Sequence, residues 1–472
     1  MVRKPSLSIL NRDDMNRIHS GVLSILERTG ICFECPEAVA LFKAHGAKVD
    51  GSLVRIPAEM TEKALQTAPS QFYWEARDPA KTILMGRDQI CEPNVGCVYI
   101  QDWGGPRRLG TLEDYATVQK LHQSSAVTGL VGANPINPND IDQKTKHLYM
   151  LYEVLKNTDK AMININSNGE NSKQLLKMTA MAFGDEKISD KRICTAVSAN
   201  PLSPLAFGTD TTEAILVYAK AGQVVMVLPC AMSGVTAPVH LFGTVMTQVA
   251  ETVAGIVLAQ LVKPGCPVIA APCSSITYMK RASYVSAAPE MFLIDLASLD
   301  IFHHFYHLPT RMMTGMSESK TMDPQAAYET MQNLMMGILG GAHIIHECLG
   351  VLDSIMTMSF EKFIIDEECV SRVFRIAAGM DISEEAMSLD LIDEVGQGSY
   401  MTHESTFAHY KENWMPTVAD WSSYDTYSKM EHQDIVERAH NLYKERVAAA
   451  PETLLDAALD HDLKDYIASI VG

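Results

Sequence analysis

Between residues 91 and 360 the chain alternates short β-branched runs with longer segments of helical periodicity. This alternation is typical of βα units on a parallel sheet. Eight runs are expected to form strands, at residues 95–101, 127–133, 161–165, 192–197, 224–228, 267–271, 311–314 and 342–345. Helical patterns lie between them at residues 112–122, 144–155, 173–183, 211–221, 241–261, 289–305 and 324–339. Eight such units favour an α/β fold of the (β/α)8 TIM barrel type over an open sheet.

The segments on either side of this region have their own patterns. Residues 12–29 have helical spacing and end at Gly30, residues 38–45 repeat that spacing, and Asp50-Gly51 is a favoured hairpin dipeptide. The chain after residue 360 is helical and acidic. The predicted organisation is an α-rich cap with a small hairpin (1–90), a TIM barrel (91–360) and a C-terminal helical extension (361–472).

Charge and composition narrow the range of partners. Lys and Arg total 39 against 57 Asp and Glu, a formal net charge of −18. That charge opposes contact with nucleic acid or anionic lipid, so we expect neither as a partner. The apolar stretch 241–262 is interrupted by polar residues and is predicted to be a buried helix rather than a membrane span. The first twenty residues lack a signal-peptide core, so a cytoplasmic location is expected.

The ten cysteines are scattered, as expected of core residues in a reducing compartment. Cys32 and Cys35 form the one CxxC of the sequence, which we interpret as structural because no second pair follows at zinc spacing. Cys230, Cys273 and His346 fall at or near the ends of three predicted strands. A zinc site at the barrel mouth is therefore geometrically open, although structural cysteines are the favoured interpretation.

In a TIM barrel the active site lies at the carboxyl ends of the strands. The residues that follow the predicted strands are mostly amides and hydroxyls, among them Asn134, Asn164, Asn166, Ser198 and Ser274. Such side chains orient a substrate without supplying a strong nucleophile, although they also suit ordinary turns. The sequence contains no GxGxxG after a predicted strand, no P-loop, no HExxH and no GxSxG, which disfavours nucleotide-dependent enzymes and serine hydrolases.

Aromatic side chains fall near the same predicted rim, with Tyr99 and Trp103 at the end of the first strand and Phe360 after the eighth. Aromatic ring faces attract a quaternary ammonium by ~0.5 to ~2 kcal/mol per contact, so a cation-binding cage is conceivable. His346 ends the last strand, and His343 is expected to share its face. Arg311 opens a strand, where a structural ion pair at the bottom of the barrel is the alternative to binding a carboxylate.

Six stretches resemble a known family when their order and spacing are taken together. They are Val54-Arg55-Ile56-Pro57, Ala76-Arg77-Asp78-Pro79, Gly110-Thr111-Leu112-Glu113-Asp114, residues 258–267 (LAQLVKPGCP) after Glu251, Ala288-Pro289-Glu290, and residues 403–414 (HESTFAHYKENW). The chain resembles, over nearly its whole length, the trimethylamine methyltransferase (MttB-like) family. This resemblance implies a TIM barrel that transfers a methyl group from a methylated amine to the cobalt of a separate corrinoid protein.

One departure from the family pattern bears on the substrate. The trimethylamine enzymes carry pyrrolysine, whereas this chain contains only the twenty standard residues. It is therefore similar to the non-pyrrolysine branch, whose members demethylate quaternary amines such as glycine betaine, proline betaine and carnitine; glycine betaine is favoured. A quaternary amine loses its methyl group without a general acid, and Co(I) of the partner is the nucleophile. The resemblance thus implies neither a metal nor a tightly bound cofactor on this chain.

Within this interpretation we expect Tyr99, Trp103 and Phe360 to contact the ammonium. We expect His346, with His343 or Arg311, to hold a substrate carboxylate. Glu251 could position the ammonium as a counter-charge or be a structural helix residue. Two alternatives stay open: a zinc-dependent thiol methyltransferase using Cys230, Cys273 and His346, and a non-catalytic betaine-binding relative. A homo-oligomer formed through the C-terminal region is also open.

Overall fold

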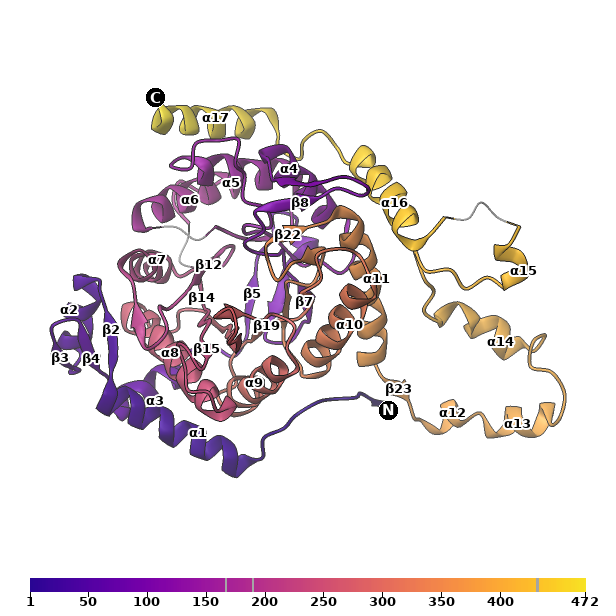
Figure 1. Ribbon diagram of the computed structural model, residues 1–472, viewed down its shortest axis with the longest axis horizontal. Coiled ribbons are helices and arrows are strands. Elements are labelled where there is room, and N and C mark those ends of the chain that lie inside the picture. The colour runs from indigo at the N-terminus through magenta and orange to yellow at the C-terminus, as the bar shows by residue number, and fades with distance from the viewer. Residues whose placement is uncertain (166–167, 189–190, 430–432) are drawn as a thin grey trace.

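The protein has a mixed α/β fold, as predicted. The computed structural model describes residues 1–165, 168–188, 191–429 and 433–472, so Asn166 lies outside the described residues. Short strands lie inside a circle of helices, and the N-terminal and C-terminal segments lie outside that circle (Figure 1).

Eight short parallel strands form the centre of the fold, and we call them the strand ring. They are β7 (Ile90–Cys91), β10 (Leu130–Gly132), β11 (Ala161–Ile163), β12 (Ala196–Ala199), β14 (Val224–Val227), β16 (Val268–Ala270), β19 (Arg311–Met313) and β20 (Ile344–His346). Parallel ladders join β19–β20–β7, β12–β14–β16 and β10–β11. Further contacts link these ladders: the parallel bridges Cys91–Thr128 and Ala270–Thr310, and the hydrogen bond from Asn164 N–H to the Ala196 carbonyl (3.0 Å).

One long helix follows each strand of the ring, which is the βα alternation that the sequence predicts. The helices are α4 (Leu112–Ser124), α5 (Lys146–Asn157), α6 (Gly169–Ala182), α7 (Thr209–Lys220), α8 (Leu241–Val262), α9 (Pro289–Leu299, continued by the π-helical turn η3, Asp300–Phe305), α10 (Pro324–Leu339) and α11 (Phe360–Ala377). Seven of the eight predicted strands overlap strands of the ring.

The first predicted strand, 95–101, is wrong as a strand of the ring. That place belongs to β7, while β8 (Tyr99–Gln101) pairs antiparallel with β9 (Arg107–Leu109) and parallel with β22 (Thr357–Met358). β22 also pairs with β21 (Val351–Leu352). Because β7 has only two residues, its signal in the sequence is weaker than that of the longer apolar run after it.

Successive side chains of a strand point to opposite faces, so alternate residues of the ring strands fill the interior of the strand ring. Val224, Met226 and Leu228 belong to one buried cluster with Ile269 and Ile344, whereas Val225 and Val227 pack with the surrounding helices. The hairpin of β5 (Phe72–Trp74) and β6 (Ile83–Met85) contributes to the same interior cluster. The backbone next to the hairpin forms hydrogen bonds with residues that precede two ring strands. The hairpin therefore closes the amino end of the ring.

Helix α8 is the predicted buried helix. Among the described residues it is the one helix long and apolar enough to cross a membrane by composition, and most of its residues are buried. It packs against α3 (Ala58–Thr67), α7, α9 and α1 (Arg12–Ser24) within the largest buried cluster. The burial of α8 confirms the prediction that residues 241–262 form a buried helix.

The N-terminal segment forms a small α-rich unit beside α8 (Figure 1). Its other elements are the π-helical turn η1 (Ile25–Thr29), β2 (Ile31–Phe33), α2 (Pro36–Ala44), β3 (Lys48–Asp50) and β4 (Leu53–Arg55). β3 and β4 form the predicted hairpin around Asp50-Gly51, and β2 pairs parallel with β13 (Ala206–Phe207). A short 3-10 turn, η2 (Pro79–Lys81), lies within the β5–β6 hairpin.

The remaining elements lie at the edges of this core. β15 (Met232–Ser233), β17 (Ser275–Tyr278) and β18 (Ser283–Tyr284) form a small sheet just beyond β14 and β16. After α11 the chain forms β23 (Met380–Asp381), which pairs with β1 (Val2–Arg3), then α12 (Glu384–Met387), α13 (Leu389–Val395), α14 (Glu404–His409), η4 (Tyr410–Glu412) and α15 (Tyr424–Tyr427). α16 (Ile435–Ala449) then packs on α11 and α4, and α17 (Ala457–Val471) packs on α5 and α6.

Candidate active site

Four charged side chains meet inside the strand ring, and we call Glu92, Arg311, His346 and Glu347 the buried ion cluster. In the β19–β20 ladder Arg311 pairs with Ile344, which faces the interior, and His346 lies two residues further along the same face. Glu92 directly follows β7, and Glu347 directly follows β20. Glu92, His346 and Glu347 therefore lie at the carboxyl ends of parallel strands, where a fold of this kind binds small molecules, and Arg311 reaches them from the start of β19.

The contacts within the cluster are direct. One carboxylate oxygen of Glu92 accepts a hydrogen bond from Arg311 Nε and forms an ion pair with His346 Nδ1. His346 Nε2 lies 2.9 Å from Glu347 Oε1, which also accepts the backbone N–H of Val95 at 3.0 Å. Each of the four charged residues is at most 2% exposed. His346 thus has a carboxylate at each ring nitrogen.

The pKa shifts agree with a set of ionised partners. Burial raises the pKa of Glu92, but Arg311 and His346 lower it by more, and the net shift is downward. Burial and Arg311 lower the pKa of His346, but Glu92 and Glu347 outweigh them and the net shift is upward. The geometry therefore holds an ionised Glu92 against a protonated His346.

The backbone around His346 and Glu347 is tightly constrained. Thr314 donates its backbone N–H (2.8 Å) and its hydroxyl (3.1 Å) to the carbonyl of His346. Glu347 has a φ of 54°, in the left-handed region that a side chain normally avoids. A Cβ on Gly315 would lie 2.3 Å from the Cα of Cys348, so only glycine allows this close approach. Packing between two neighbouring strands thus fixes the position of the Glu347 carboxylate.

Several buried oxygens near the strand ends have no hydrogen-bond partner among the described residues. They include Glu92 Oε2, Glu347 Oε2, Asn134 Oδ1 and both carboxyl oxygens of Asp295. Burial raises the pKa of Asp295 well above its usual range. A quaternary ammonium has no N–H, so oxygens that attract it need not form hydrogen bonds with it. This arrangement suits a permanent cation.

Glu92 and Asp295 were absent from the candidates predicted by sequence. Glu92 follows a two-residue strand that the pattern did not reveal. Asp295 lies in the middle of apolar α9, where it is 2% exposed. A carboxylate within an apolar segment is the signal that could have identified both residues, because burial of such a group requires a partner or a function.

The ring contacts of the three aromatic candidates are all with residues outside the buried ion cluster. The guanidinium of Arg107 lies over the ring of Tyr99, 4.1 Å from its centroid. Trp103 is 42% exposed, and its ring lies 4.8 Å from that of His440 of α16 at a tilt of 49°. Phe360 is buried 5.4 Å from the ring of Tyr443 on α16. Trp103 and Phe360 therefore fix α16 to the core, and Tyr99 already contacts a cation of the chain itself.

His343 and Glu251 also lie apart from the cluster. His343 precedes β20 and faces the helices rather than sharing the face of His346, because three positions separate the two residues and faces alternate. Its Nδ1 accepts the backbone N–H of Thr310 (3.1 Å), and its ring packs 4.5 Å from His303. Glu251 of α8 accepts bonds from the hydroxyl of Ser203 (2.8 Å) and the N–H of Leu205 (2.7 Å), which fixes the turn before β13.

The described residues do not provide the set of ligands that the zinc-dependent alternative requires. A side-chain hydrogen bond with Cys273 lowers the pKa of the neighbouring Cys230, but His346 is held between Glu92 and Glu347. Within the described ranges, no three His, Cys, Asp or Glu side chains are arranged to hold a metal ion. All ten cysteines, Cys32 and Cys35 included, are free thiols.

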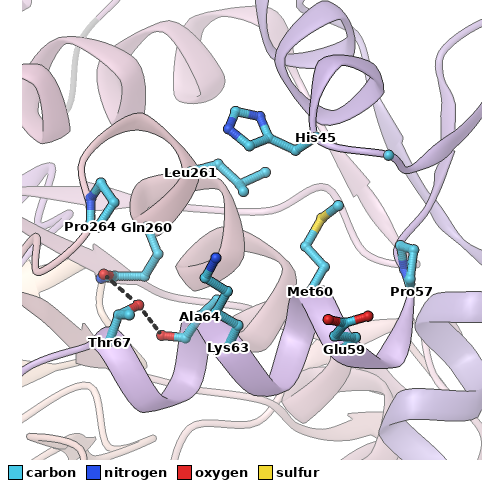
Figure 2. A pocket seen from close by; sticks show the side chains of 11 residues that line it. His45, Pro57, Glu59, Met60, Lys63, Ala64, Thr67, Gln260, Leu261 and Pro264 are labelled. Atoms are coloured by element: carbon cyan, nitrogen blue, oxygen red, sulfur yellow. Dashed lines mark hydrogen bonds between the residues drawn. The ribbon is translucent and has the colours of Figure 1, made fainter.

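A separate cleft of about 490 Å³ lies between α3 and the C-terminal end of α8 (Figure 2). Its lining includes Met60, Lys63 and Leu261, and Thr67 donates to Gln260 Oε1 (3.3 Å) at its edge (Figure 2). None of the buried ion cluster lines this cleft. It lies at the end of α8 that leads into β16, which is the amino side of the strand ring, and so it takes no part in the candidate active site.

A mixed α/β protein with paired charges buried at strand carboxyl ends belongs to the class that binds small ligands there. The sequence matches the family model described as "Trimethylamine methyltransferase (MTTB)" over residues 1–470. The chain belongs to this family, and the predicted resemblance is confirmed.

Two curated relatives are similar over almost the entire chain. A "Glycine betaine methyltransferase" of Desulfitobacterium hafniense (strain Y51) is 35% identical, with 98% of this chain and 97% of the relative covered. A "Proline betaine:corrinoid methyltransferase" of Eubacterium limosum is 31% identical, with 92% of each covered. Among solved structures, the monomethylamine methyltransferase (MtmB) of Methanosarcina barkeri has a TM-score of 0.52 at 11% identity, covering 93% of this chain and 89% of that one. This likeness supports the fold alone.

Proposed function

We propose that this protein transfers a methyl group from a quaternary amine to the Co(I) of a separate corrinoid protein. The observation that carries this conclusion is the 35% identity, over 98% of the chain, to a glycine betaine methyltransferase. Relatives named for proline betaine and L-carnitine also match over more than nine-tenths of the chain. These three substrates are all quaternary amines. Trimethylamine methyltransferases also match, at 28% identity for one of Desulfitobacterium hafniense, but the relatives with identities above 30% are named for betaines, so we favour the quaternary class and, within it, glycine betaine.

We further propose that the strand ring is the predicted (β/α)8 barrel. Parallel pairing between neighbours, one helix after each strand and the likeness to MtmB support this assignment. The carboxyl end would then be the mouth through which the corrinoid reaches the substrate. The hairpin β5–β6 closes the other end.

The reaction needs little acid–base chemistry from the protein. The electron pair of Co(I) forms the bond to the methyl carbon, and the C–N bond breaks with its electrons moving to nitrogen. The nitrogen loses its positive charge and leaves as a tertiary amine, dimethylglycine for glycine betaine, while cobalt becomes methyl-Co(III). No proton is transferred. The chain therefore contributes positioning and a site that excludes water, which is worth up to ~7 to ~11 kcal/mol in well-oriented systems.

We assign the ammonium of the substrate to the oxygens of Glu92 and Glu347 that have no hydrogen-bond partner, with Asn134 beside them. The support is their burial without donors, since a permanent cation needs negative potential and no acceptor for a hydrogen bond. Arg311 is the cation best placed to face a substrate carboxylate. His346, held at both nitrogens, acts as a positioning residue that orients the two glutamates.

The buried ion cluster contains two carboxylates and two cations. A ligand without net charge leaves that balance unchanged, whereas a purely cationic ligand adds an uncompensated charge to a dry site. A zwitterionic betaine therefore fits the cluster better than tetramethylammonium. We expect tetramethylammonium to inhibit weakly, with an inhibition constant well above the KM for betaine. Equal binding of the two would remove this argument for a zwitterion.

The deciding experiment is turnover of purified protein with its cognate Co(I) corrinoid protein. Glycine betaine, proline betaine, carnitine and trimethylamine are offered separately, with methyl-Co(III) followed spectroscopically and the amine product by mass spectrometry. We expect one tertiary amine per methylated cobalt from a quaternary substrate. Binding of betaine without turnover would support the non-catalytic alternative, and preference for trimethylamine would refute the substrate assignment.

A further inference from the structure

Two cysteines lie opposite each other just beyond the strand ring, and we call Cys230 and Cys273 the thiol pair. The ladders on either side of them, β14–β16 and β15–β17, share one register, and in that register the two cysteines are partners. The backbone N–H of Cys273 donates to the carbonyl of Pro229 (2.9 Å), and that of Ser275 donates to the carbonyl of Ala231 (3.0 Å), as a parallel ladder requires here. Partner residues of parallel strands point to the same face, so the two thiols face the same side.

The spacing of the thiol pair suits a disulfide. Neighbouring strands lie about 4.8 Å apart, and a disulfide joins Cα atoms that are roughly 4.4–6.8 Å apart. A side-chain hydrogen bond already joins the two thiols, and Cys273 Sγ also donates to the carbonyl of Pro229 at 3.2 Å. A bond between the two sulfur atoms therefore requires little movement of the strands.

The two thiols differ in accessibility and acidity. Cys230 is exposed, whereas Cys273 is 5% exposed. The hydrogen bond with Cys273 lowers the pKa of Cys230, desolvation opposes this effect, and a hydrogen bond with Tyr284 adds to it. The same contact with Cys230, followed by burial, raises the pKa of Cys273. Because oxidants attack the thiolate, Cys230 is expected to react first, and Cys273 remains a thiol that can attack the oxidised sulfur.

The thiol pair lies at the same end of the strand ring as the candidate active site. Both cysteines follow the carboxyl ends of their strands, and Cys273 packs in one buried cluster with Met313, the last residue of β19. The hydroxyl of Tyr284 donates to the carbonyl of Cys273 at 2.6 Å. Burial raises the pKa of Tyr284, and so do the two cysteines, Asp295 and Glu347. Tyr284 therefore lies between the thiol pair and the carboxylates of the candidate site.

We propose that the thiol pair is a reversible redox switch: hydrogen peroxide joins Cys230 to Cys273 as a disulfide, and this disulfide slows methyl transfer until a dithiol reduces it. The Cys230 thiolate attacks one oxygen of the peroxide, the O–O bond breaks, and a sulfenic acid forms as hydroxide leaves and takes up a proton. The Cys273 thiol then attacks that sulfur, the S–O bond breaks, and water leaves with the thiol proton. The two thiols lose two electrons, and the peroxide gains them and becomes two molecules of water.

The disulfide changes the charge and the contacts at the mouth of the ring. A Cys230 thiolate is a negative group at the end of the ring where the ammonium is proposed to bind, whereas a disulfide is uncharged. The disulfide also replaces the hydrogen bonds that the two thiols form with Pro229 and Tyr284. We therefore expect methyl transfer to become about tenfold slower or more. This effect on turnover rests on the proposed function, whereas formation of the disulfide does not.

Another pair of contacting thiols provides a comparison within the same chain. Cys91 and Cys348 also share a side-chain hydrogen bond, but both are fully buried. An oxidant in solution does not reach either sulfur while the protein is folded. We therefore expect Cys91 and Cys348 to stay reduced under conditions that oxidise the thiol pair.

The first test is peptide mapping by mass spectrometry. The reduced full chain is treated with hydrogen peroxide and digested without reductant. We expect a linked product that joins the peptides of Cys230 and Cys273, two hydrogens lighter than the free peptides, and dithiothreitol should separate it. Cys230→Ser should lose this product, and in Cys273→Ser the Cys230 thiol should instead advance to a sulfinic acid that dithiothreitol does not reverse. A natural chain without the linked product would overturn the proposal.

The second test measures methyl transfer after oxidation. Catalase removes the peroxide, and glycine betaine is then added with Co(I) corrinoid protein that has been freed of its reductant, so that the disulfide survives the assay. We expect the single-turnover rate of the natural chain to fall about tenfold or more and to recover with dithiothreitol, whereas Cys230→Ser should keep its own untreated rate. The matched control is Cys32→Ser, which removes a partly buried thiol of the N-terminal unit and should respond as the natural chain does.

The two tests keep the switch and the proposed function apart. A linked product with an unchanged rate of methyl transfer would overturn the switch. A reduced, untreated chain that is inactive with every amine would refute the proposed function. The thiol pair would then be judged by the linked product alone, whose presence supports the proposed oxidation and whose absence overturns it.

Discussion

Replacing Glu251 with Gln should stabilise the protein at neutral and alkaline pH. Glu251 is fully buried in α8, and burial raises its pKa from 4.5 to about 7. Between these two values the unfolded chain releases a proton that the folded chain retains, so the wild type loses stability as the pH rises through this window. The backbone N–H of Leu205 can still bond to the Gln carbonyl, and Ser203 can accept from its amide.

The magnitude follows from the shift. A pKa raised from 4.5 to about 7 corresponds to ~3 kcal/mol of folding free energy at 1.36 kcal/mol per unit. The free energy of unfolding of Glu251→Gln, measured relative to that of wild type, should therefore increase by ~3 kcal/mol between pH 4 and pH 8. Urea denaturation at both pH values measures this change. The same stability difference at both pH values would refute the reasoning.

Glu368 supplies the matched control, because its pKa is shifted the other way. Burial raises the pKa of Glu368, but the backbone N–H groups of residues 417–419 lower it by more. Its contribution to stability is present at neutral pH and is lost as the pH falls, so Glu368→Gln should destabilise the protein at pH 8 more than at pH 4.

The activity of Glu251→Gln also decides between two interpretations of Glu251. If Glu251 is structural, the kcat/KM of the variant should stay within about twofold of wild type, whereas a large loss would make Glu251 a counter-charge for the ammonium.

Three further substitutions test the candidate active site. Glu347→Gln should raise the KM for betaine about 10- to 100-fold in steady-state kinetics, because it removes a charge worth ~1.4 to ~2.8 kcal/mol; an unchanged KM would exclude contact with the ammonium. Arg311→Met should lower the free energy of unfolding in urea by ~3 to ~5 kcal/mol, because Glu92 loses its buried partner; a loss below 1 kcal/mol would contradict an ionised cluster. Gly315→Ala should cost ~1 to ~3 kcal/mol in thermal denaturation and most of kcat/KM, because its Cβ meets the backbone of Cys348; normal activity would mean that Glu347 tolerates displacement.

The repeating part of the fold was predictable from sequence because each unit repeats the same two patterns. Eight β-branched runs alternate with seven helical periods, and seven of the eight runs overlap ring strands. The missed strand, β7, is short, and its place in the ring depends on long-range pairing with β20. Local pattern says nothing about such pairing, so the stronger apolar run at 95–101 displaced it.

The candidate site was only partly predictable. His346 follows from the rule that sites lie at strand ends, whereas Arg311 opens a predicted strand and its partner Glu92 depends on the missed strand. The prediction of Tyr99 and Trp103 depends on a ring strand at 95–101. Once β8 lies outside the ring, the reason for choosing these two residues no longer holds.

The difficulty of predicting this site has a chemical cause. An enzyme that supplies its own nucleophile or metal fixes a few residue types at short spacings, and these form a motif. Here the proposed nucleophile belongs to another protein, so no local spacing is constrained by the reaction. What the reaction does constrain is a balance of buried charges, contributed by positions as far apart as Glu92 and Arg311. Buried charges of this kind are stable only when opposite charges contact each other in the folded protein. Such contacts are recognised from burial and distances, and the order of residues in the sequence does not reveal them.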